Sequence, residues 1–375
     1  MISSIKVQKY GFLSVFLILN PKNEKMILVT GATGLVGGNL LWYLLQENEQ
    51  IVALRRANSN INSLRTIFSF YTSDPDEFLS RIEWRTADLL NESMLRSVMQ
   101  NITEIYHCAA TVSLENAPEN LLNNNVKGTQ NIVQAALNAR IRRFCHVSSI
   151  AACGRETGTK LTDENSPWIE DHHRSVYAQS KHLSEQEVWK GIKSGLNAVI
   201  VNPGVILGVS GTDKGSLLLF AQIQKGLPFY TGGGSGYVDV QDVVKIMIQL
   251  MKSGITNERF IVVSENCSTK NLLNMIADGF GAKRPFIYIG RKTMLVAGLT
   301  AGFFGKIFNF QPIIDESVAR SITRSEFYSN QKINKAIEFK FNLIEDSVKE
   351  ICRFIKINEN ENQRKNENPG DRFSV

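Results

Sequence analysis

Thr30-Gly31-Ala32-Thr33-Gly34-Leu35-Val36-Gly37 follows a short apolar run that begins at Met26, and it opens an amphipathic stretch that ends at Gln46. Its three glycines stand three residues apart. Glycine lets a backbone turn sharply and approach a pyrophosphate, whose charge is met by the amino end of the following helix. The stretch therefore predicts a strand, a phosphate-binding turn and a helix; a flexible turn without a ligand is the alternative. The residues expected around the cofactor are Gly31, Thr33, Gly34, Leu35, Val36 and Gly37.

Apolar runs continue to alternate with amphipathic stretches along the chain. Strands are expected at residues 26–30, 50–54, 82–86, 104–108, 143–148, 197–202 and 259–263. Helices are expected between the early strands, for example over residues 37–46 and 126–138. Because units of strand and crossover helix wind right-handedly, the prediction is an α/β protein with a doubly wound parallel Rossmann sheet.

The pattern changes after Pro203. Residues 225–237 are rich in glycine, and later helices are expected to begin near Asn271 and Asp315 without long strands between them. We interpret this part as a smaller, mostly helical C-terminal lid that binds a substrate in a cleft over the sheet. The apolar run at residues 293–305 is too short to cross a membrane, so we expect a helix packed over the pocket.

These changes of pattern give the expected domain boundaries. The Rossmann core covers residues 26–202, and residues 238–265 return to it. Residues 203–237 and 266–357 form the lid. Residues 358–375 offer almost nothing to bury and are expected to be disordered.

The amino terminus, residues 1–25, is expected to be an extension outside the fold. Its apolar run at residues 11–19 follows Lys6 and Lys9 like the core of a signal peptide, but no small-residue cleavage site follows. Nine residues are too few to span a bilayer as a helix. An upstream extension or a mis-chosen start is our interpretation, with a membrane-proximal anchor as the alternative.

Composition and charge narrow the function classes. The 375 residues are 43% hydrophobic and 21% charged, which is ordinary for a soluble globular protein. The net charge of +6 is too dilute to indicate a nucleic-acid partner. The five cysteines include no CxxC pair and no spacing that suggests zinc, so we expect no metal site and buried thiols in a reducing cytoplasm.

Arg55 and Arg56 end the second expected strand. NAD enzymes of this architecture place an acidic side chain there, which binds the adenosine ribose hydroxyls. Arginine pairs well with a 2′-phosphate, so NADP is the expected cofactor and NAD the alternative. A surface charge pair without a ligand is the other interpretation.

Two further strand ends are expected to border the cofactor. Asp88-Leu89 follows the third strand, where the carboxylate either accepts a hydrogen bond from the adenine amino group or caps the next helix. Ala109-Ala110 follows the fourth strand, and its small side chains would let a cofactor lie close to the backbone.

Tyr177-Ala-Gln-Ser-Lys181 places a phenol and an ammonium four residues apart. On a helix the two share a face, and a nearby cation stabilises the phenolate of a tyrosine, whose free pKa is about 10. The pair is suited to proton exchange near neutral pH, although the same spacing occurs by chance in many helices. Ser148 and Ser149 end the strand expected before it, and Asn125 begins a short motif on the preceding helix.

With the glycine turn, these residues occur in the order found in the extended short-chain dehydrogenase/reductase superfamily, also called NAD-dependent epimerase/dehydratase proteins. The chain resembles that superfamily over about residues 26–355. The resemblance implies that Ser149 hydrogen-bonds the substrate oxygen and that Tyr177 donates or accepts the proton. It also implies that Lys181 binds the nicotinamide ribose and lowers the tyrosine pKa. The choice between Ser148 and Ser149 is open, with the spacing to Gly154 favouring Ser149.

The resemblance also suggests roles for three other positions. Asn125 would support a proton-relay water or the backbone of the active site. Pro203, followed by Gly204, would border the nicotinamide. Val238-Asp-Val-Gln-Asp242 matches a further motif of the family near the cleft.

The subfamily is indicated by what stands after the catalytic serine. Sugar-nucleotide dehydratases carry an acidic pair there, whereas this chain has Ile150-Ala151. Lid arginines that would hold a sugar-nucleotide diphosphate are sparse, since Arg259 is the only one between residues 205 and 260. The chain looks more like dihydroflavonol reductase-like enzymes and their hydroxysteroid dehydrogenase relatives. Four later arginines keep the epimerase interpretation open: Arg284, Arg291, Arg320 and Arg324.

The sequence therefore predicts an NADP-dependent oxidoreductase that acts on the carbonyl or secondary alcohol of a small molecule. An NAD-dependent sugar-nucleotide epimerase is the first alternative, and a non-catalytic nucleotide-sensing protein on the same fold is the second. We expect a cytoplasmic protein without stable membrane insertion, and a homodimer is common in the family.

Overall fold

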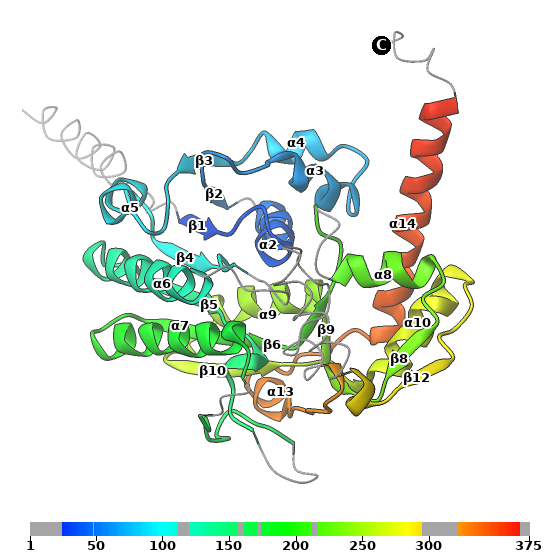
Figure 1. Ribbon diagram of the computed structural model, residues 1–375. Helices are drawn as coiled ribbons and strands as arrows, with labels where there is room; N and C mark the ends of the chain where they lie inside the picture. Colours follow the sequence, from blue (N-terminus) through cyan, green and yellow to red (C-terminus); the bar gives the residue numbers. More distant parts are fainter. Residues whose placement is uncertain are drawn as a thin grey trace, which may run out of the picture.

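The computed structural model describes residues 25–47, 49–111, 120–155, 161–170, 174–211, 216–294 and 322–367, with side chains described to residue 360. The expected extension before Lys25, the part of the apolar run after Met294 and the helix expected near Asp315 lie outside the described residues. The described elements form a large parallel sheet with helices on both faces and a smaller part beside it (Figure 1).

Seven strands form the main sheet in the order β10-β6-β5-β4-β1-β2-β3, and every neighbouring pair is parallel. They are β1 (Met26–Thr30), β2 (Gln50–Arg55), β3 (Glu83–Thr86), β4 (Glu104–His107), β5 (Arg143–Val147), β6 (Ala198–Pro203) and β10 (Glu258–Val262). Each predicted strand is present with both ends within one residue of the prediction. The strand order reverses between β1 and β4, which creates the crevice where doubly wound sheets bind ligands. The Rossmann prediction is confirmed.

Helices cover both faces of this sheet (Figure 1). One layer contains α2 (Leu35–Gln46), α3 (Asn62–Ser69), α4 (Pro75–Leu79) and α9 (Val240–Lys252). The other contains α5 (Glu92–Val98), α6 (Leu121–Asn138) and α7 (Val176–Lys193). Side chains alternate along a strand, so Ile27 and Val29 of β1 are buried in the first layer and Leu28 in the second. The short helix η1 (Ile150–Ala152) directly follows β5.

The smaller part combines helices with two small sheets, β11-β9-β7 and β12-β8. Its elements are β7 (Val205–Leu207), α8 (Ser216–Gln224), β8 (Phe229–Thr231), β9 (Gly234–Asp239), β11 (Glu265–Ser268), α10 (Thr269–Phe280) and β12 (Ile287–Ile289). A further helix, α13 (Gln331–Ile337), lies against β10 of the main sheet. Strands this short hold too few alternating residues for hydrophobic periodicity to reveal them.

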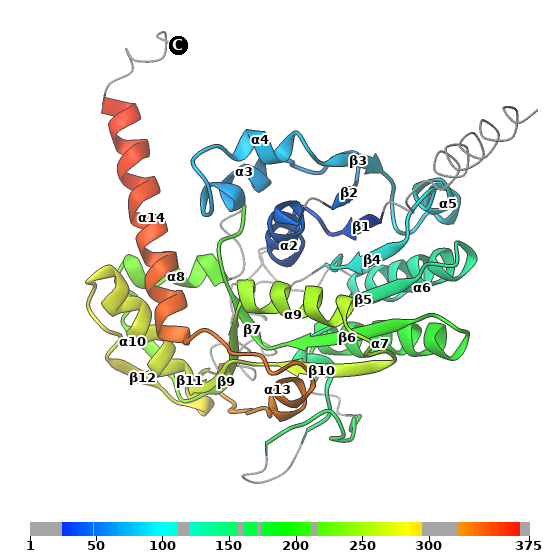
Figure 2. The ribbon, with the colours of Figure 1, turned by 180° about the vertical axis from the view of Figure 1, so that it is seen from behind.

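The last helix, α14 (Ile344–Glu367), differs from the prediction of disorder from residue 358. Its first turns bury Ile344, Val348 and Ile351 against the lid, and the helix then extends away from the body (Figure 2). Once a helix has begun, each further residue adds a backbone hydrogen bond without needing burial. The backbone therefore continues as a helix to Glu367.

Candidate active site

The glycine turn after β1 fits only because two of its residues lack a side chain. Gly31 has a φ of +66°, and a Cβ there would lie 2.6 Å from the backbone nitrogen of Ala109. A Cβ on Gly37 would lie 2.3 Å from the carbonyl oxygen of Gly31. The first clash would push β1 away from the end of β4, and the second would push α2 away from the turn. These glycines therefore hold the ends of β1 and β4 and the start of α2 close together.

The amino end of α2 fits a bound anion. Its N-cap is Gly34, which is exposed and offers no side chain to the free N–H groups of the first turn. That turn also carries no acidic residue. The N–H groups and the positive end of the helix dipole can therefore bind a phosphate, as the glycine pattern predicts. Thr33, Leu35 and Val36 are half-buried around this helix start.

Arg55 is the last residue of β2 and has unused hydrogen-bonding capacity. Its Nε is buried and has no hydrogen-bond partner among the described residues. The guanidinium carbon lies 5.8 Å from the centre of the Trp84 ring. Arg56 is exposed beside it, and its backbone nitrogen donates to the Ser59 hydroxyl over 3.0 Å. A buried guanidinium nitrogen without an acceptor fits a phosphate ligand at this strand end.

Asp88 and Ala109 make local contacts. Oδ1 of Asp88 accepts a hydrogen bond from the backbone nitrogen of Leu90 at 2.9 Å, so the carboxylate already caps a turn. The carbonyl oxygen of Leu89 accepts from Asn131 at 2.9 Å. Ala109 donates from its backbone nitrogen to the Thr30 hydroxyl over 3.3 Å. The adenine contact of Asp88 stays a prediction, as does the approach of a cofactor to Ala109 and the half-buried Ala110.

The two neighbouring serines after β5 have different partners. Ser148 is buried, and its hydroxyl donates to Oε2 of Glu185 over 2.8 Å. The hydroxyl of Ser149 accepts from the backbone nitrogen of Ala151 at 3.1 Å and is hydrogen-bonded to the phenol of Tyr177. We call Ser149 and Tyr177 the hydroxyl pair. Of the two serines, Ser149 is the one next to the tyrosine.

The pKa of Tyr177 does not follow the sequence prediction. Burial raises the pKa of the phenol, and the hydrogen bond from Ser149 opposes this. Lys181 was expected to lower the tyrosine pKa, but its Nζ donates to the carbonyl oxygen of Val147 over 2.8 Å. Burial lowers the pKa of Lys181 itself to about 8, with Cys108 and Glu185 acting in the opposite direction. The expectation of a lowered tyrosine pKa is therefore wrong for this arrangement.

Asn125 joins the loop after β4 to α7. Its amide nitrogen donates to the carbonyl oxygen of Thr111 over 3.0 Å and to the hydroxyl of Ser180 over 3.1 Å. Its amide oxygen accepts from the backbone nitrogen of Thr111 at 2.8 Å. Of the two roles considered for Asn125, these bonds match support of the active-site backbone. Ser180 in turn donates to the carbonyl oxygen of Tyr177 over 2.8 Å, so the hydrogen bonds of Asn125 are connected through Ser180 to the backbone of the hydroxyl pair.

A buried carboxylate that the sequence analysis missed lies behind the serines. Glu185 is 1% exposed, and its Oε2 accepts from Ser148 and from the amide of Asn202, both at 2.8 Å. Its Oε1 accepts from Arg259 at 3.0 Å and from the indole of Trp189 at 3.2 Å. We call these five residues the buried anchor. It ties α7 to β5, β6 and β10.

The anchor also reaches the hydroxyl pair through the backbone, since Asn202 donates to the carbonyl oxygen of Ser149 over 3.0 Å. A signal for Glu185 was present in the sequence. Tyr177, Lys181 and Glu185 recur every four residues, which places them along one face of α7.

The motif at residues 238–242 and the strand end before it have structural roles. Pro203 is buried at the end of β6. Asp239 caps α9, where it accepts from the backbone nitrogen of Gln241 at 2.6 Å. Asp242 accepts two hydrogen bonds from Asn342, at 2.8 and 3.0 Å, and burial raises its pKa to about 6. The motif therefore fastens α9 to the chain that leads into α14.

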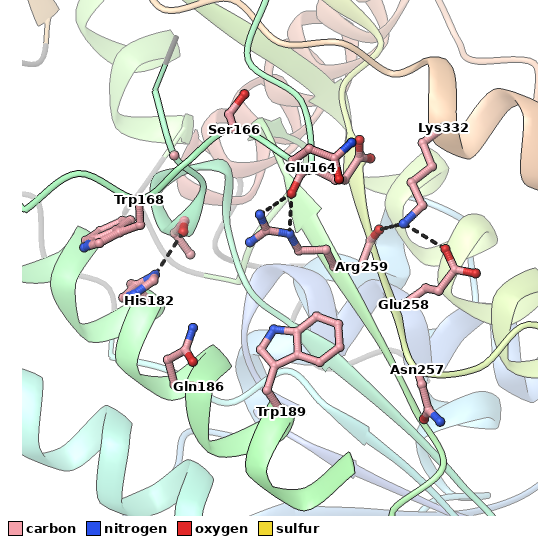
Figure 3. Close-up of a pocket in the computed structure, with 13 residues that line it drawn as sticks. Glu164, Ser166, Trp168, His182, Gln186, Trp189, Asn257, Glu258, Arg259 and Lys332 are labelled. Carbon is pink, nitrogen blue, oxygen red and sulfur yellow. Dashed lines mark hydrogen bonds and ion pairs between the residues drawn. The ribbon is translucent and has the colours of Figure 1, made fainter. Parts of the chain in front are cut away.

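A polar groove of about 450 Å³ lies beside the edge strand β10 and is separate from the hydroxyl pair (Figure 3). Its charged groups bind one another: Arg259 pairs with Glu185, and Lys332 lies 2.8 Å from Glu258. One carboxylate oxygen of Glu164 accepts from the backbone nitrogen of Ile261 in β10 at 2.8 Å. The charged groups that line the groove are thus paired or hydrogen-bonded along the edge of the sheet.

Two kinds of feature are absent from the described part of the chain. No helix within it is both long and apolar enough to cross a membrane. Its histidine, cysteine and acidic side chains form no group of three or more that could hold a metal ion.

Known proteins are similar to this chain over most of its length. The sequence profile described as "NAD dependent epimerase/dehydratase family" matches residues 27–263. A "Putative dihydroflavonol 4-reductase" of Synechocystis sp. is 32% identical over 265 residues, which cover 68% of this chain and 73% of the relative. "Sterol demethylase protein B" of Methylococcus capsulatus is 29% identical over 275 residues, 71% of this chain and 78% of the relative.

Solved structures share the fold. The crystal structure of gox2253 has a TM-score of 0.74 at 24% identity, covering 89% of this chain and 98% of that one. A UDP-glucose 4-epimerase from Thermotoga maritima has a TM-score of 0.69 at 15% identity, covering 89% of this chain and 99% of the epimerase. At these identities the likeness concerns the fold alone.

Proposed function

Because the chain belongs to the NAD dependent epimerase/dehydratase family and is an NAD(P)-dependent oxidoreductase, we propose that it reduces the carbonyl group of a small molecule, or oxidises the matching secondary alcohol. The observation that carries the proposal is the hydroxyl pair. A serine and a tyrosine hydroxyl are hydrogen-bonded to each other at the carboxyl end of β5, beside the crevice of the sheet. Two such hydroxyls can bind one substrate oxygen together.

In the proposed reduction each residue of the pair has one task. Ser149 donates a hydrogen bond to the substrate carbonyl oxygen and holds it next to the phenol. Tyr177 gives its proton to that oxygen, and the phenolate is reprotonated from solvent. A bound nicotinamide supplies the hydride to the carbonyl carbon, or accepts it in the reverse direction.

Lys181 is proposed to bind the cofactor. Its ammonium is buried and is held by a carbonyl oxygen of β5, so it has donors left for ribose hydroxyls. Pro203 ends β6 and Ala109 follows β4, the strands on either side of β5, and both residues would border the nicotinamide.

We propose NADP as the cofactor, with NAD as the alternative. The unpartnered Nε of Arg55 and the exposed Arg56 beside it support a 2′-phosphate at the end of β2. An acidic residue at that place would support NAD, and this chain has none there. The mass of any nucleotide that copurifies with the protein tests this point directly. Copurified NAD would overturn it.

The proposed substrates are carbonyl compounds rather than sugar nucleotides. Ile150 and Ala151 follow Ser149 where dehydratases of the superfamily carry an acidic pair. Two lid arginines that would hold a diphosphate are already paired: Arg284 forms two 2.7 Å bonds to Asp278, and Arg324 lies 3.2 Å from Glu326. The relatives named as dihydroflavonol 4-reductase and cinnamoyl-CoA reductase point in the same direction.

The deciding experiment is a panel of aldehydes, ketones and sterols, with oxidation of NADPH as the readout. Turnover of one class, abolished in Tyr177→Phe, would support the proposal. If the panel gave no turnover while UDP-sugars were interconverted, the epimerase alternative would replace it. Nucleotide binding without turnover of either class would favour a sensing protein on the same fold.

A further inference from the structure

The lid carries an exposed apolar edge that no element of the described chain covers. We call it the lid edge and define it by Phe229 of β8 and by Phe286, Ile287 and Tyr288 in and beside β12. Their exposed fractions are 43%, 59%, 39% and 58%. The two paired strands β8 and β12 lie at the outside of the molecule (Figure 1). Large exposed apolar side chains on such neighbouring strands mark an interaction surface.

The apolar side chains point to both faces of this small sheet. Ile287 pairs with Phe229 and Tyr288 pairs with Tyr230 in the parallel register. Successive side chains alternate between faces, so Ile287 and Phe229 share one face, while Tyr288 and Tyr230, with ring centres 5.6 Å apart, share the other. Tyr230 is half-buried and packs against the apolar cluster that α8 and α10 form, so the open apolar surface of the sheet consists of Phe229 and Ile287 on one face and the exposed ring of Tyr288 at the outer strand. Such an outer strand is suited to entering a soft apolar layer.

Positive charge surrounds the lid edge. Residues 281–292 contain four cations and no acid, within a chain whose net charge is +6. Arg284 is neutralised by Asp278, which leaves Lys283 before the strand and Arg291 and Lys292 after it. All three are exposed. Cations at both ends of an apolar strand match an anionic surface that has an apolar interior.

The lysines lie directly over aromatic rings. Nζ of Lys283 is 4.4 Å from the centre of the Phe286 ring, and Nζ of Lys270 is 4.6 Å from that of Tyr230. In such an arrangement the ring can enter the boundary of a bilayer while the ammonium stays at the headgroups. Tyrosine also prefers this boundary, where its ring is apolar and its hydroxyl is hydrated.

We propose that the lid edge docks this protein on the surface of a membrane that contains anionic lipids. The aromatic and aliphatic side chains enter the headgroup boundary, and Lys283, Arg291 and Lys292 contact the lipid phosphates. Each such cation contributes attraction that is screened by salt. Single-stranded nucleic acid also binds basic and aromatic surfaces. The rings of Tyr288 and Tyr230 are tilted by 49° to each other, and Tyr230 packs against the buried cluster, so these two rings form no open stacking pair for bases.

The test is cosedimentation of the full chain with vesicles of phosphatidylcholine alone or mixed with phosphatidylglycerol. We expect binding at least about tenfold tighter to the mixed vesicles, weakened by added salt. Phe286→Ser with Tyr288→Ser, and separately Lys283→Glu with Lys292→Glu, should each weaken it by about tenfold. Thermal unfolding and nucleotide binding like those of the unaltered chain would show that each variant is folded.

Matched controls carry the same changes elsewhere on the surface. Leu343 and Ile169, 60% and 52% exposed, are replaced by serine, and Lys127 and Lys190 are replaced by glutamate. These variants should bind vesicles as the unaltered chain does. Three results would overturn the proposal: no binding to mixed vesicles at low salt, lid-edge variants that bind undiminished, or binding of a single-stranded oligonucleotide but not of vesicles. None of these readouts needs turnover, so they are independent of the proposed chemistry.

Discussion

The hydroxyl pair and the buried anchor lie on the same face of α7, about two helical turns apart, and they use their polar groups differently. In the anchor, both oxygens of Glu185 accept two hydrogen bonds each from protein donors. In the pair, Tyr177 is partly exposed and Ser149 is its hydrogen-bond partner. The carboxylate of Glu185 therefore has no hydrogen-bonding capacity left for a ligand, whereas the hydroxyl pair does. One face of α7 thus carries a carboxylate whose hydrogen bonds are all used within the protein and a phenol that can still bind a ligand, and this difference separates the structural role from the proposed catalytic one.

The largest effect expected is on turnover when the pair is broken. Tyr177→Phe removes the proton donor and keeps the ring, so we expect a loss of about 10²- to 10⁴-fold in kcat with stability nearly unchanged. Tyr43→Phe is the matched control, because its hydroxyl donates to Gln241 over 2.6 Å away from the pair. Carbonyl reduction that persisted in Tyr177→Phe would remove the tyrosine from the mechanism.

Substitution of Glu185 in the buried anchor should lower the free energy of unfolding. Glu185→Ala removes the carboxylate that pairs with the partly buried guanidinium of Arg259 and one of the two acceptors of the Asn202 amide, so we expect about 3 kcal/mol less free energy of unfolding in urea. Glu185→Gln keeps an acceptor oxygen and should recover part of the loss. Glu187→Ala, which removes a partner of the exposed Lys190, should cost less than about 1 kcal/mol. Equal losses in Glu185→Ala and Glu187→Ala would contradict the anchor.

The two serines give the sharpest test of the comparison, because they are neighbours. Ser149→Ala should lower kcat by about 10²-fold and leave stability unchanged. Ser148→Ala leaves one oxygen of Glu185 with a single donor and should cost about 1–2 kcal/mol of stability with little change in kcat. Steady-state kinetics and urea unfolding of both variants separate the roles. The reverse result would exchange the two serines in the mechanism.

The lowered pKa of the buried Lys181 predicts that the free energy of unfolding depends on pH. Burial lowers its pKa from 10.5 to about 8, so between these values the unfolded state binds more protons than the folded state. The folded state therefore gains stability as pH rises through this window, with a slope of up to about 1.4 kcal/mol per pH unit. In Lys181→Met the contribution of this lysine to the rise in stability should be absent. The free energies of unfolding of both proteins in urea near pH 8 and pH 10 measure the difference. Parallel profiles would show that the pKa of Lys181 is not lowered.

The smallest expected effect concerns the choice of cofactor. Arg55→Gln should raise the KM for NADPH by about tenfold and leave that for NADH unchanged, because only the first carries a 2′-phosphate. Arg65→Gln is the control, since Arg65 is bound to Asp76 at 2.6 Å on the surface. An equal rise for both nucleotides would assign Arg55 to the fold rather than to the phosphate.

Most of the main sheet could be predicted from the sequence because local rules determine it. Apolar runs bounded by polar residues gave strand ends within one residue, and the glycine turn required positions without a Cβ at Gly31 and Gly37. The pairing of Ser148 with Glu185 joins residues 37 apart in the chain, and no local pattern contains it. The raised pKa of Tyr177 was missed for the same reason, since burial is a property of the assembled site. The lid strands were too short for a periodic signal.

The polar groove beside β10 has a consequence for the behaviour of the protein at high concentration. β10 is an edge strand of the main sheet, and the free N–H and C=O groups of such a strand can template pairing with another chain. Here the carboxylate of Glu164 holds the N–H of Ile261, and Lys332 donates to the C=O of Arg259 over 2.9 Å. These side chains occupy the positions that an added strand would need. The groove thus protects this edge of the sheet against edge-to-edge aggregation.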